Sequence, residues 1–120
     1  MKVLSLSLLG VLATVSTVAA SASTDDLTAR QARCDLTIDG VSYMDGGCNF
    51  NFLPRYSGEP GGSFEIRRRG YVVRVITNGD GTARGYFNGV RGRSRVNVRL
   101  GTLVRNGACW VNERAIVCAR

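Results

Sequence analysis

The chain has 120 residues, of which 44% are hydrophobic and 21% are charged, the composition of a globular protein rather than a disordered one. Its formal net charge is +7, and it contains no histidine. The absence of histidine excludes Ser-His and Cys-His nucleophile pairs, histidine-ligated metals and acid-base catalysis by histidine.

The first 22 residues predict a signal peptide. Lys2 precedes a run of apolar or small residues over 3–18, and Ala20-Ser21-Ala22 fits a small-x-small cleavage site. The run contains several Ser, Thr and Gly residues, which favours a cleaved signal over a membrane-spanning anchor. We therefore expect a periplasmic or secreted protein with no stable membrane span after cleavage.

Removal of residues 1–22 leaves about 98 residues, enough for one domain. Residues 23–33 are polar and lack a clear period, so they predict a flexible leader before a single β domain over 34–120. This mature chain has 15 Arg and no Lys against 9 Asp and Glu, a net charge of +6.

Turn dipeptides recur along the predicted domain. Asn-Gly and Asp-Gly favour hairpin turns because both residues tolerate positive φ. These pairs are Asp39-Gly40, Asp45-Gly46, Asn78-Gly79, Asp80-Gly81, Asn88-Gly89 and Asn106-Gly107. Short runs rich in Val, Ile, Thr and aromatic residues lie between them, with no helical stripe of useful length.

This pattern predicts an all-β fold, a small antiparallel barrel or sandwich built from sequential hairpins. The predicted strands are 34–38, 41–44, 48–53, 63–68, 71–77, 82–88, 95–104, 108–112 and 115–119. Residues 54–62 contain two Pro and three Gly and therefore predict a loop.

Four cysteines in a short exported chain predict two disulfides, for which three pairings exist. Local pairing is the economical choice, because a turn at Glu113-Arg114 places Cys109 opposite Cys118. Cys34 and Cys48 then close a loop of 15 residues, which is worth roughly 3 kcal/mol. Neither pair has the C-x-x-C spacing of a zinc site, so we predict no metal and no cofactor.

An arginine row is the strongest candidate for function. Residues 90–100 alternate in character, with aliphatic residues at 96, 98 and 100, which predicts a strand with arginines on its outer face. The arginines of the row are Arg91, Arg93, Arg95 and Arg99. Further contributors are Arg74, Arg84, the run 67–69 and Tyr86, whose ring can stack on a sugar.

Arginine forks suit phosphate, sulfate and carboxylate groups. The row therefore predicts a non-enzymatic binding protein whose partner is an acidic polymer, either a polysaccharide or lipopolysaccharide phosphate, or an acidic envelope protein. Export argues against a nucleic-acid partner. The alternative is that these arginines are solvated outward positions that reflect codon bias and protect a strand edge from pairing.

Two other functions stay open. The loop 54–62, with Arg55 and Tyr56 as anchors, suits an inhibitor of a cell-wall hydrolase or a protease, because a rigid loop binds with little ordering cost. A cationic secreted antimicrobial or toxin is the other, although no amphipathic helix is present to insert into a membrane. Glu65 and Glu113 are conceivable acid-base groups, but their spacing defines no catalytic pair, and we predict that the protein is not an enzyme.

Several segments together support a resemblance to a known group of proteins. They are 34–40 with Tyr43, 47–50, 61–66, 83–89 and 103–112, the last containing Gly-Ala-Cys-Trp-Val-Asn. Across nearly the whole mature chain, these segments resemble a group of small secreted proteins of alphaproteobacteria. The resemblance implies a disulfide-containing envelope protein with a signal peptide and assigns no catalytic residue. The arginine row is not part of the shared pattern.

Overall fold

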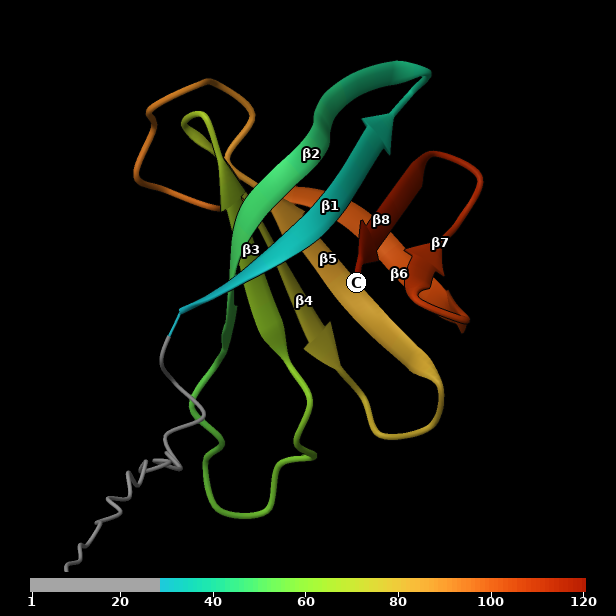
Figure 1. Cartoon of the computed structure of the whole chain (residues 1–120). Coiled ribbons are helices and arrows are strands. Elements are labelled where there is room, and N and C mark those ends of the chain that lie inside the picture. Colours follow the sequence, from blue (N-terminus) through green and yellow to red (C-terminus); the bar gives the residue numbers. More distant parts are fainter. Residues whose placement is uncertain (1–28) are drawn as a thin grey trace, which may run out of the picture.

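The computed structural model describes residues 29–120, so the predicted signal 1–22 and residues 23–28 of the predicted leader lie outside the described residues. Within 29–120, eight antiparallel strands close into a barrel in which each strand pairs with the next and the last pairs with the first (Figure 1). The all-β prediction is confirmed. The strands are β1 (Arg30–Ile38), β2 (Val41–Phe52), β3 (Phe64–Arg68), β4 (Tyr71–Thr77), β5 (Thr82–Phe87), β6 (Val98–Asn106), β7 (Cys109–Val111) and β8 (Ala115–Ala119).

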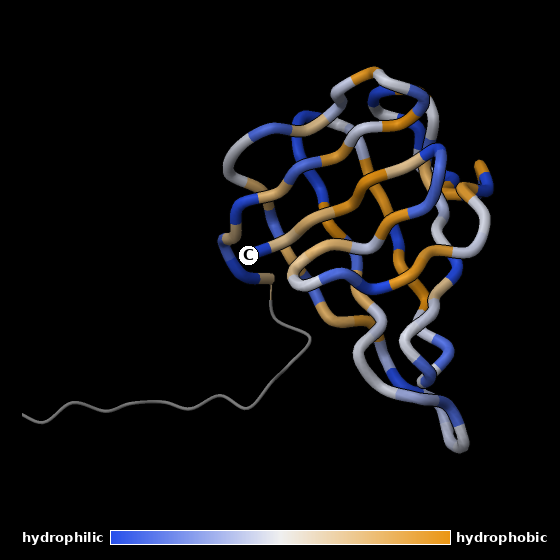
Figure 2. The backbone as a smooth tube through the Cα atoms, turned by 90° about the vertical axis from the view of Figure 1, so that its right-hand side faces the viewer, coloured by the Kyte–Doolittle hydropathy of each residue, from blue (hydrophilic) through white to orange (hydrophobic). Residues whose placement is uncertain are grey.

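The core lies inside the barrel. Successive side chains of a strand point to opposite faces, so each strand contributes alternate residues to the interior. Leu36, Ile66, Val73 and Leu103 are fully buried there, and Trp110 is buried as well. The same alternation is visible as hydrophobic and hydrophilic residues that alternate along the strands (Figure 2).

Several predicted turns are confirmed. Asp39 and Gly40 both have positive φ, 51° and 82°, as a tight two-residue hairpin turn requires. The β3–β4 turn repeats this geometry at Arg69 and Gly70, with φ values of 51° and 85°. Arg69 adopts this conformation without being glycine, and its side chain thereby lies at the tip of the turn.

The predicted turn at Asp45-Gly46 is wrong, because β2 continues through both residues. The reason is the length of its partner: β1 begins at Arg30, inside the predicted leader, and pairs with β2 from Arg30↔Phe50 to Ile38↔Val41. The segment 30–33 is therefore part of the barrel wall rather than a flexible leader, and two predicted strands merge into one.

The predicted strand at 95–104 is displaced, since β6 begins only at Val98. Residues 88–97 form a loop instead, and Asn88-Gly89 opens that loop rather than making a hairpin turn. The loop folds back over the β3–β4 turn, where Gly92 N–H donates to the Gly70 carbonyl at 2.8 Å. The alternation of residues 91–95 thus belongs to a loop and not to a strand face.

Both disulfides pair as predicted, Cys34 with Cys48 and Cys109 with Cys118. Cys109 and Cys118 are direct register partners between β7 and β8. Disulfides indicate an oxidising compartment, extracellular or periplasmic. Residues 29–120 include no helix that is long and apolar enough to cross a membrane.

The two ends of the barrel carry different connections. The cationic end is formed by the β1–β2 turn, the β3–β4 turn, loop 88–97 and the β7–β8 turn. The open end is formed by loop 53–63, the β4–β5 turn over 78–81 and the β6–β7 turn. Figure 1 shows loop 53–63 extending away from the barrel at the open end, while loop 88–97 lies beside the β3–β4 turn.

Candidate anion-binding site

A groove of about 520 Å³ lies at the cationic end, between β2, the β3–β4 turn and loop 88–97. Its cationic lining residues are Arg67, Arg68, Arg69 and Arg93. None of the described residues that line it carries a carboxylate. The groove therefore concentrates positive charge on one concave surface, the arrangement that focuses an attractive field on an anion.

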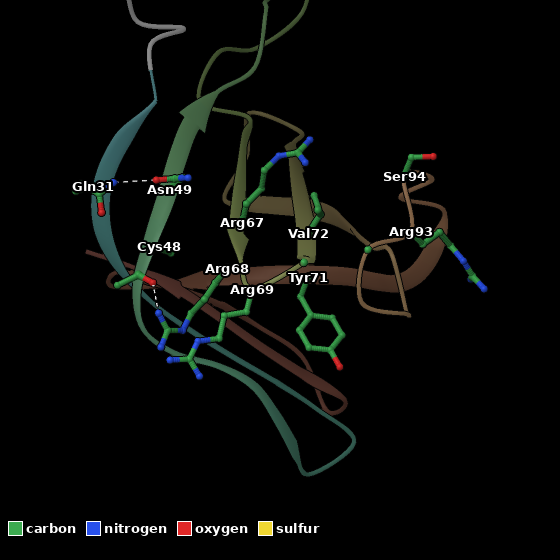
Figure 3. A pocket seen from close by; sticks show the side chains of 13 residues that line it. Gln31, Cys48, Asn49, Arg67, Arg68, Arg69, Tyr71, Val72, Arg93 and Ser94 are labelled. Carbon is green, nitrogen blue, oxygen red and sulfur yellow. Dashed lines mark hydrogen bonds between the residues drawn. The ribbon is translucent and has the colours of Figure 1, made fainter.

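Arg68 and Arg69 lie together on the β2 side of the groove, whereas the Arg67 side chain points away from them (Figure 3). The Arg68 guanidinium covers Gly46, and its Nη2 would lie 3.0 Å from a Cβ at that position. Its Nη1 donates to the Gly47 carbonyl at 2.5 Å. Gly46, from the predicted Asp45-Gly46 turn, thus provides the space for Arg68, and the neighbouring Gly47 provides the acceptor.

Asn88 fixes the loop that forms the other wall. Its side chain is fully buried, and its Oδ1 accepts a hydrogen bond from Val72 N–H at 3.0 Å. Its Nδ2 donates to the carbonyls of Gly70, Val90 and Arg93 at 2.9, 3.1 and 3.0 Å. One amide therefore joins β4, the β3–β4 turn and loop 88–97. This places Arg93 across the groove from Arg68 and Arg69.

An aromatic cluster lies beneath the same end. Tyr43 packs against Tyr71 and Phe87 with ring centroids 5.2 and 5.0 Å apart. The Arg91 guanidinium lies 5.1 Å from the centroid of the Tyr71 ring. This cation–π contact holds Arg91 against the barrel instead of leaving it free in solvent.

A polar row crosses the outer wall of β3 to β6 through consecutive register partners. In strand order its members are Glu65, Arg74, Tyr86 and Arg99. The Glu65 side chain is only 7% exposed and accepts from Arg67 Nε at 2.5 Å and Arg74 Nε at 2.8 Å. Part of the predicted cationic surface is therefore neutralised by a buried carboxylate.

The pKa of Glu65 lies below its usual range. Burial raises the pKa of this carboxyl. The hydrogen bonds and charges of Arg67 and Arg74 together lower the pKa by more than burial raises it. Glu65 is thus held ionised as the centre of an ion-pair cluster, and this lowered pKa suits an ion pair rather than a proton donor.

The structure divides the predicted binding residues into three groups. Arg91, Arg93 and Arg95 lie on loop 88–97, while Arg74, Arg84, Tyr86 and Arg99 lie on the outer wall, and Arg55 and Tyr56 lie on loop 53–63. Only Arg93 of these lines the groove. A single row of Arg91, Arg93, Arg95 and Arg99 is not formed, because the first three lie outside a strand.

Sequence reasoning names the four arginines of the groove but does not predict that they line one groove. It gives the run 67–69 only as a contributor, although Arg-Arg-Arg-Gly at a two-residue turn is a signal for clustered guanidinium groups. Asn88 was assigned to a turn, and no local pattern distinguishes a turn asparagine from one whose amide is buried.

At the open end, Tyr56 is the most exposed large hydrophobic residue described, at 69%. Its turn is held internally: Arg55 Nε donates to the Glu59 carbonyl at 2.8 Å, and the Tyr56 N–H donates to Glu59 Oε1 at 3.3 Å. Loop 53–63 therefore presents an exposed aromatic side chain from a restrained turn.

Comparison of the chain with protein-family models, with curated proteins and with solved structures gave no match. The similarity to secreted alphaproteobacterial proteins therefore stays a prediction. Within residues 29–120, no group of three or more His, Cys, Asp or Glu side chains is placed to hold a metal ion.

Proposed function

We propose that this is a non-enzymatic periplasmic or secreted binding protein that engages an acidic envelope polymer through its cationic end. The observation that supports this most strongly is the groove lined by Arg67, Arg68, Arg69 and Arg93 and, among its described lining residues, by no carboxylate. Guanidinium groups bind phosphate and carboxylate oxygens through paired N–H donors.

Most of the lining charge is available to a ligand. Arg67 is paired with Glu65, but Arg68, Arg69 and Arg93 form no ion pair within the described part of the chain. Arg69 is placed at the tip of its turn by positive φ, and Arg93 is held by the Asn88 amide through its carbonyl. Because these backbone positions are fixed before binding, a polyanion pays little ordering cost to meet them.

The experiment measures retention of purified lipopolysaccharide by the immobilised oxidised protein over a range of salt concentrations. We expect binding to weaken steeply with salt, because exposed charges are screened and counterions return to the polyanion. The double variant Arg69→Glu with Arg93→Glu should lower retention by about tenfold or more.

The matched control is Arg84→Glu with Arg99→Glu, which makes the same change in net charge on the outer wall. We expect this control to retain most of the polymer bound by the wild type. Equal losses for the two double variants would show that net charge alone governs binding and would overturn the groove as the site.

A second candidate, an inhibitor of a cell-wall hydrolase or protease, is favoured by the exposed Tyr56 on its restrained turn. An aromatic anchor on a pre-organised loop is a common centre of protein interfaces. Turbidity assays of cell-wall lysis and assays of protease activity, with and without the protein, test this candidate. Slower turnover that Tyr56→Ala restores supports it, whereas unchanged rates across several hydrolases and proteases contradict it.

A further inference from the structure

The open end contains a cavity that the polymer-binding proposal does not use. It has a volume of about 420 Å³, within the range typical of small-molecule sites. Its main aromatic lining residues are Phe50, Phe52, Phe64 and Trp110. The mouth of a barrel is a common location for such sites, because the wall positions side chains around a recess. We call this cavity the aromatic mouth.

Strand register places the aromatic residues at the mouth. Phe52 and Phe64 are partners across β2 and β3, and Phe50 lies two residues along the same inner face. The Phe50 and Phe64 rings are stacked with centroids 5.0 Å apart, while Phe50 and Phe52 meet edge to face at 4.9 Å. The rings thus support one another and leave flat apolar surface toward the recess.

Small residues keep the mouth open. Gly61, Gly62, Gly79 and Gly81 all line it. A Cβ at Gly79 would approach Pro60 within 3.1 Å, so a side chain there would push against loop 53–63. The recess is therefore a consequence of sequence, since larger residues at these turns would fill the space between the loops.

Among the described residues that line the mouth, Arg105 is the one that carries a charge. Arg105 is the register partner of Trp110 across β6 and β7, and its Cζ lies 5.7 Å from the centroid of the Trp110 ring. Its Nε donates to the Gly107 carbonyl at 3.1 Å, which fixes the guanidinium beside the mouth. Among the described lining residues, none carries a carboxylate, so Arg105 meets no opposite charge there.

We propose that the aromatic mouth binds a small aromatic anion, with its ring system against the phenylalanine and tryptophan side chains and its acidic group at Arg105. An aromatic body suits the ring surfaces, and a single negative charge suits one guanidinium at the rim. This site lies at the opposite end from the arginine groove and does not rest on the proposed function.

The probe is 1-anilinonaphthalene-8-sulfonate, and its matched neutral probe is N-phenyl-1-naphthylamine, which has the same rings without the sulfonate. Trp110 is the only tryptophan of the chain, so energy transfer from this one donor reports binding of the dye to the protein, and the variants below locate it. In titrations of the oxidised protein we expect one site per chain. The anionic dye should bind about tenfold more tightly than the neutral dye.

Three variants separate the parts of the proposal. Arg105→Gln should abolish the preference for the anionic dye and leave the affinity for the neutral dye unchanged. Ala108→Phe, at an exposed position that lines the mouth, should weaken both dyes by filling the recess. Arg99→Gln removes the same charge from the outer wall and should behave like the wild type.

The absence of energy transfer with either dye would overturn the site. Equal affinities of the wild type for the two dyes, or an unchanged preference in Arg105→Gln, would overturn the role of the anion. Binding that Ala108→Phe does not weaken would place the dye outside the mouth and contradict the proposal. A far-ultraviolet circular dichroism spectrum like that of the wild type confirms that each variant has folded.

Discussion

The two ends of the barrel are joined by the same strands, but their long loops are placed differently. At the cationic end, loop 88–97 folds over the β3–β4 turn and is held by the buried Asn88 amide. At the open end, loop 53–63 extends away from the barrel (Figure 1). An aromatic recess lies at this end. Among the described residues, Asn88 is the one buried amide side chain, so the open end has no equivalent of this contact.

Each end also combines aromatic rings with an arginine, in different surroundings. Arg91 lies over Tyr71, whose ring packs into the cluster with Tyr43 and Phe87 and also lines the groove of about 520 Å³. Arg105 lies over Trp110, and both residues line the cavity of about 420 Å³. In the described part of the chain, the groove is lined by four arginines, whereas the aromatic mouth is lined by one.

The largest effect on this comparison should come from Asn88→Ala. The change removes the partner of the buried Val72 N–H and of the Arg93 carbonyl, and one of the two donors to each of the Gly70 and Val90 carbonyls, so we expect a loss of about 3 kcal/mol in unfolding free energy. Chemical denaturation measures the loss, and hydrogen exchange should show faster opening of 89–97. Asn78→Ala, which removes one exposed bond to Thr82, is the control and should change stability by less than about 1 kcal/mol.

If Asn88→Ala destabilised the protein no more than its control, the amide would not hold the cationic end closed. Faster exchange spread evenly over both ends would also contradict the account. None of the hydrogen bonds of the Asn88 side chain reaches a residue of the open end.

A smaller, pH-dependent effect is expected from Glu65, in the wall between the two ends. Its pKa in the folded protein lies below the ordinary 4.5, so its ion pairs stabilise the fold above that pH and are lost as the pH falls through the folded pKa. We expect Glu65→Gln to cost about 2 kcal/mol near neutral pH, and the difference from wild type to shrink in acid. Glu113→Gln, at an exposed turn, is the matched control.

Thermal unfolding of the wild type, Glu65→Gln and Glu113→Gln over a pH series measures how the stability difference between them depends on pH. A cost of Glu65→Gln that stayed constant down to strongly acidic pH would show that packing, not charge, accounts for the effect of this side chain.

Gly70→Ala tests how tightly loop 88–97 packs on the β3–β4 turn at the cationic end. A Cβ at Gly70 would lie 2.6 Å from Arg91 Cγ, whereas a Cβ at Gly40 would meet nothing within 4 Å. The two glycines have φ values of 85° and 82°, so alanine imposes the same backbone strain at both. We expect Gly70→Ala to cost about 1 kcal/mol more than Gly40→Ala in denaturation, through overpacking of loop 88–97. Equal costs would mean that the loop yields freely.

The smallest effect is expected at the open end. Tyr56 is 69% exposed, and replacing an exposed side chain removes little packing. We expect Tyr56→Ala to change the unfolding free energy by less than about 0.5 kcal/mol, measured by chemical denaturation. A loss above about 1 kcal/mol would show that loop 53–63 is part of the core and not a free presenting loop.

The sequence predicted the parts of the fold that depend on local rules. Alternation and turn dipeptides led to the all-β fold. Hairpin geometry led to the disulfide Cys109–Cys118, and local pairing of the remaining cysteines led to Cys34–Cys48. At Asp45-Gly46 the prediction was wrong because a glycine has two possible uses. Gly46 would suit a turn, but in β2 its missing side chain leaves room for the Arg68 guanidinium. That requirement comes from β3, which is distant in the sequence.

The candidate site was predictable only in part. Arginine composition indicated an anion-binding surface, but period-two alternation over 91–95 indicated a strand where a loop exists. Alternation reports a strand only when a neighbouring strand supplies its hydrogen bonds, and in this segment the Asn88 side chain bonds the backbone instead. The groove combines β2, the β3–β4 turn and loop 88–97, and no local pattern states that they meet.

The most direct test of the account is a titration of the isotopically labelled protein with a short phosphate polymer, followed by backbone amide chemical shifts. The account predicts that the shifted amides gather at 67–72 and 92–94, and that raised salt reverses the shifts. Shifts concentrated at Arg55 and Tyr56, or spread evenly over all exposed arginines, would contradict it.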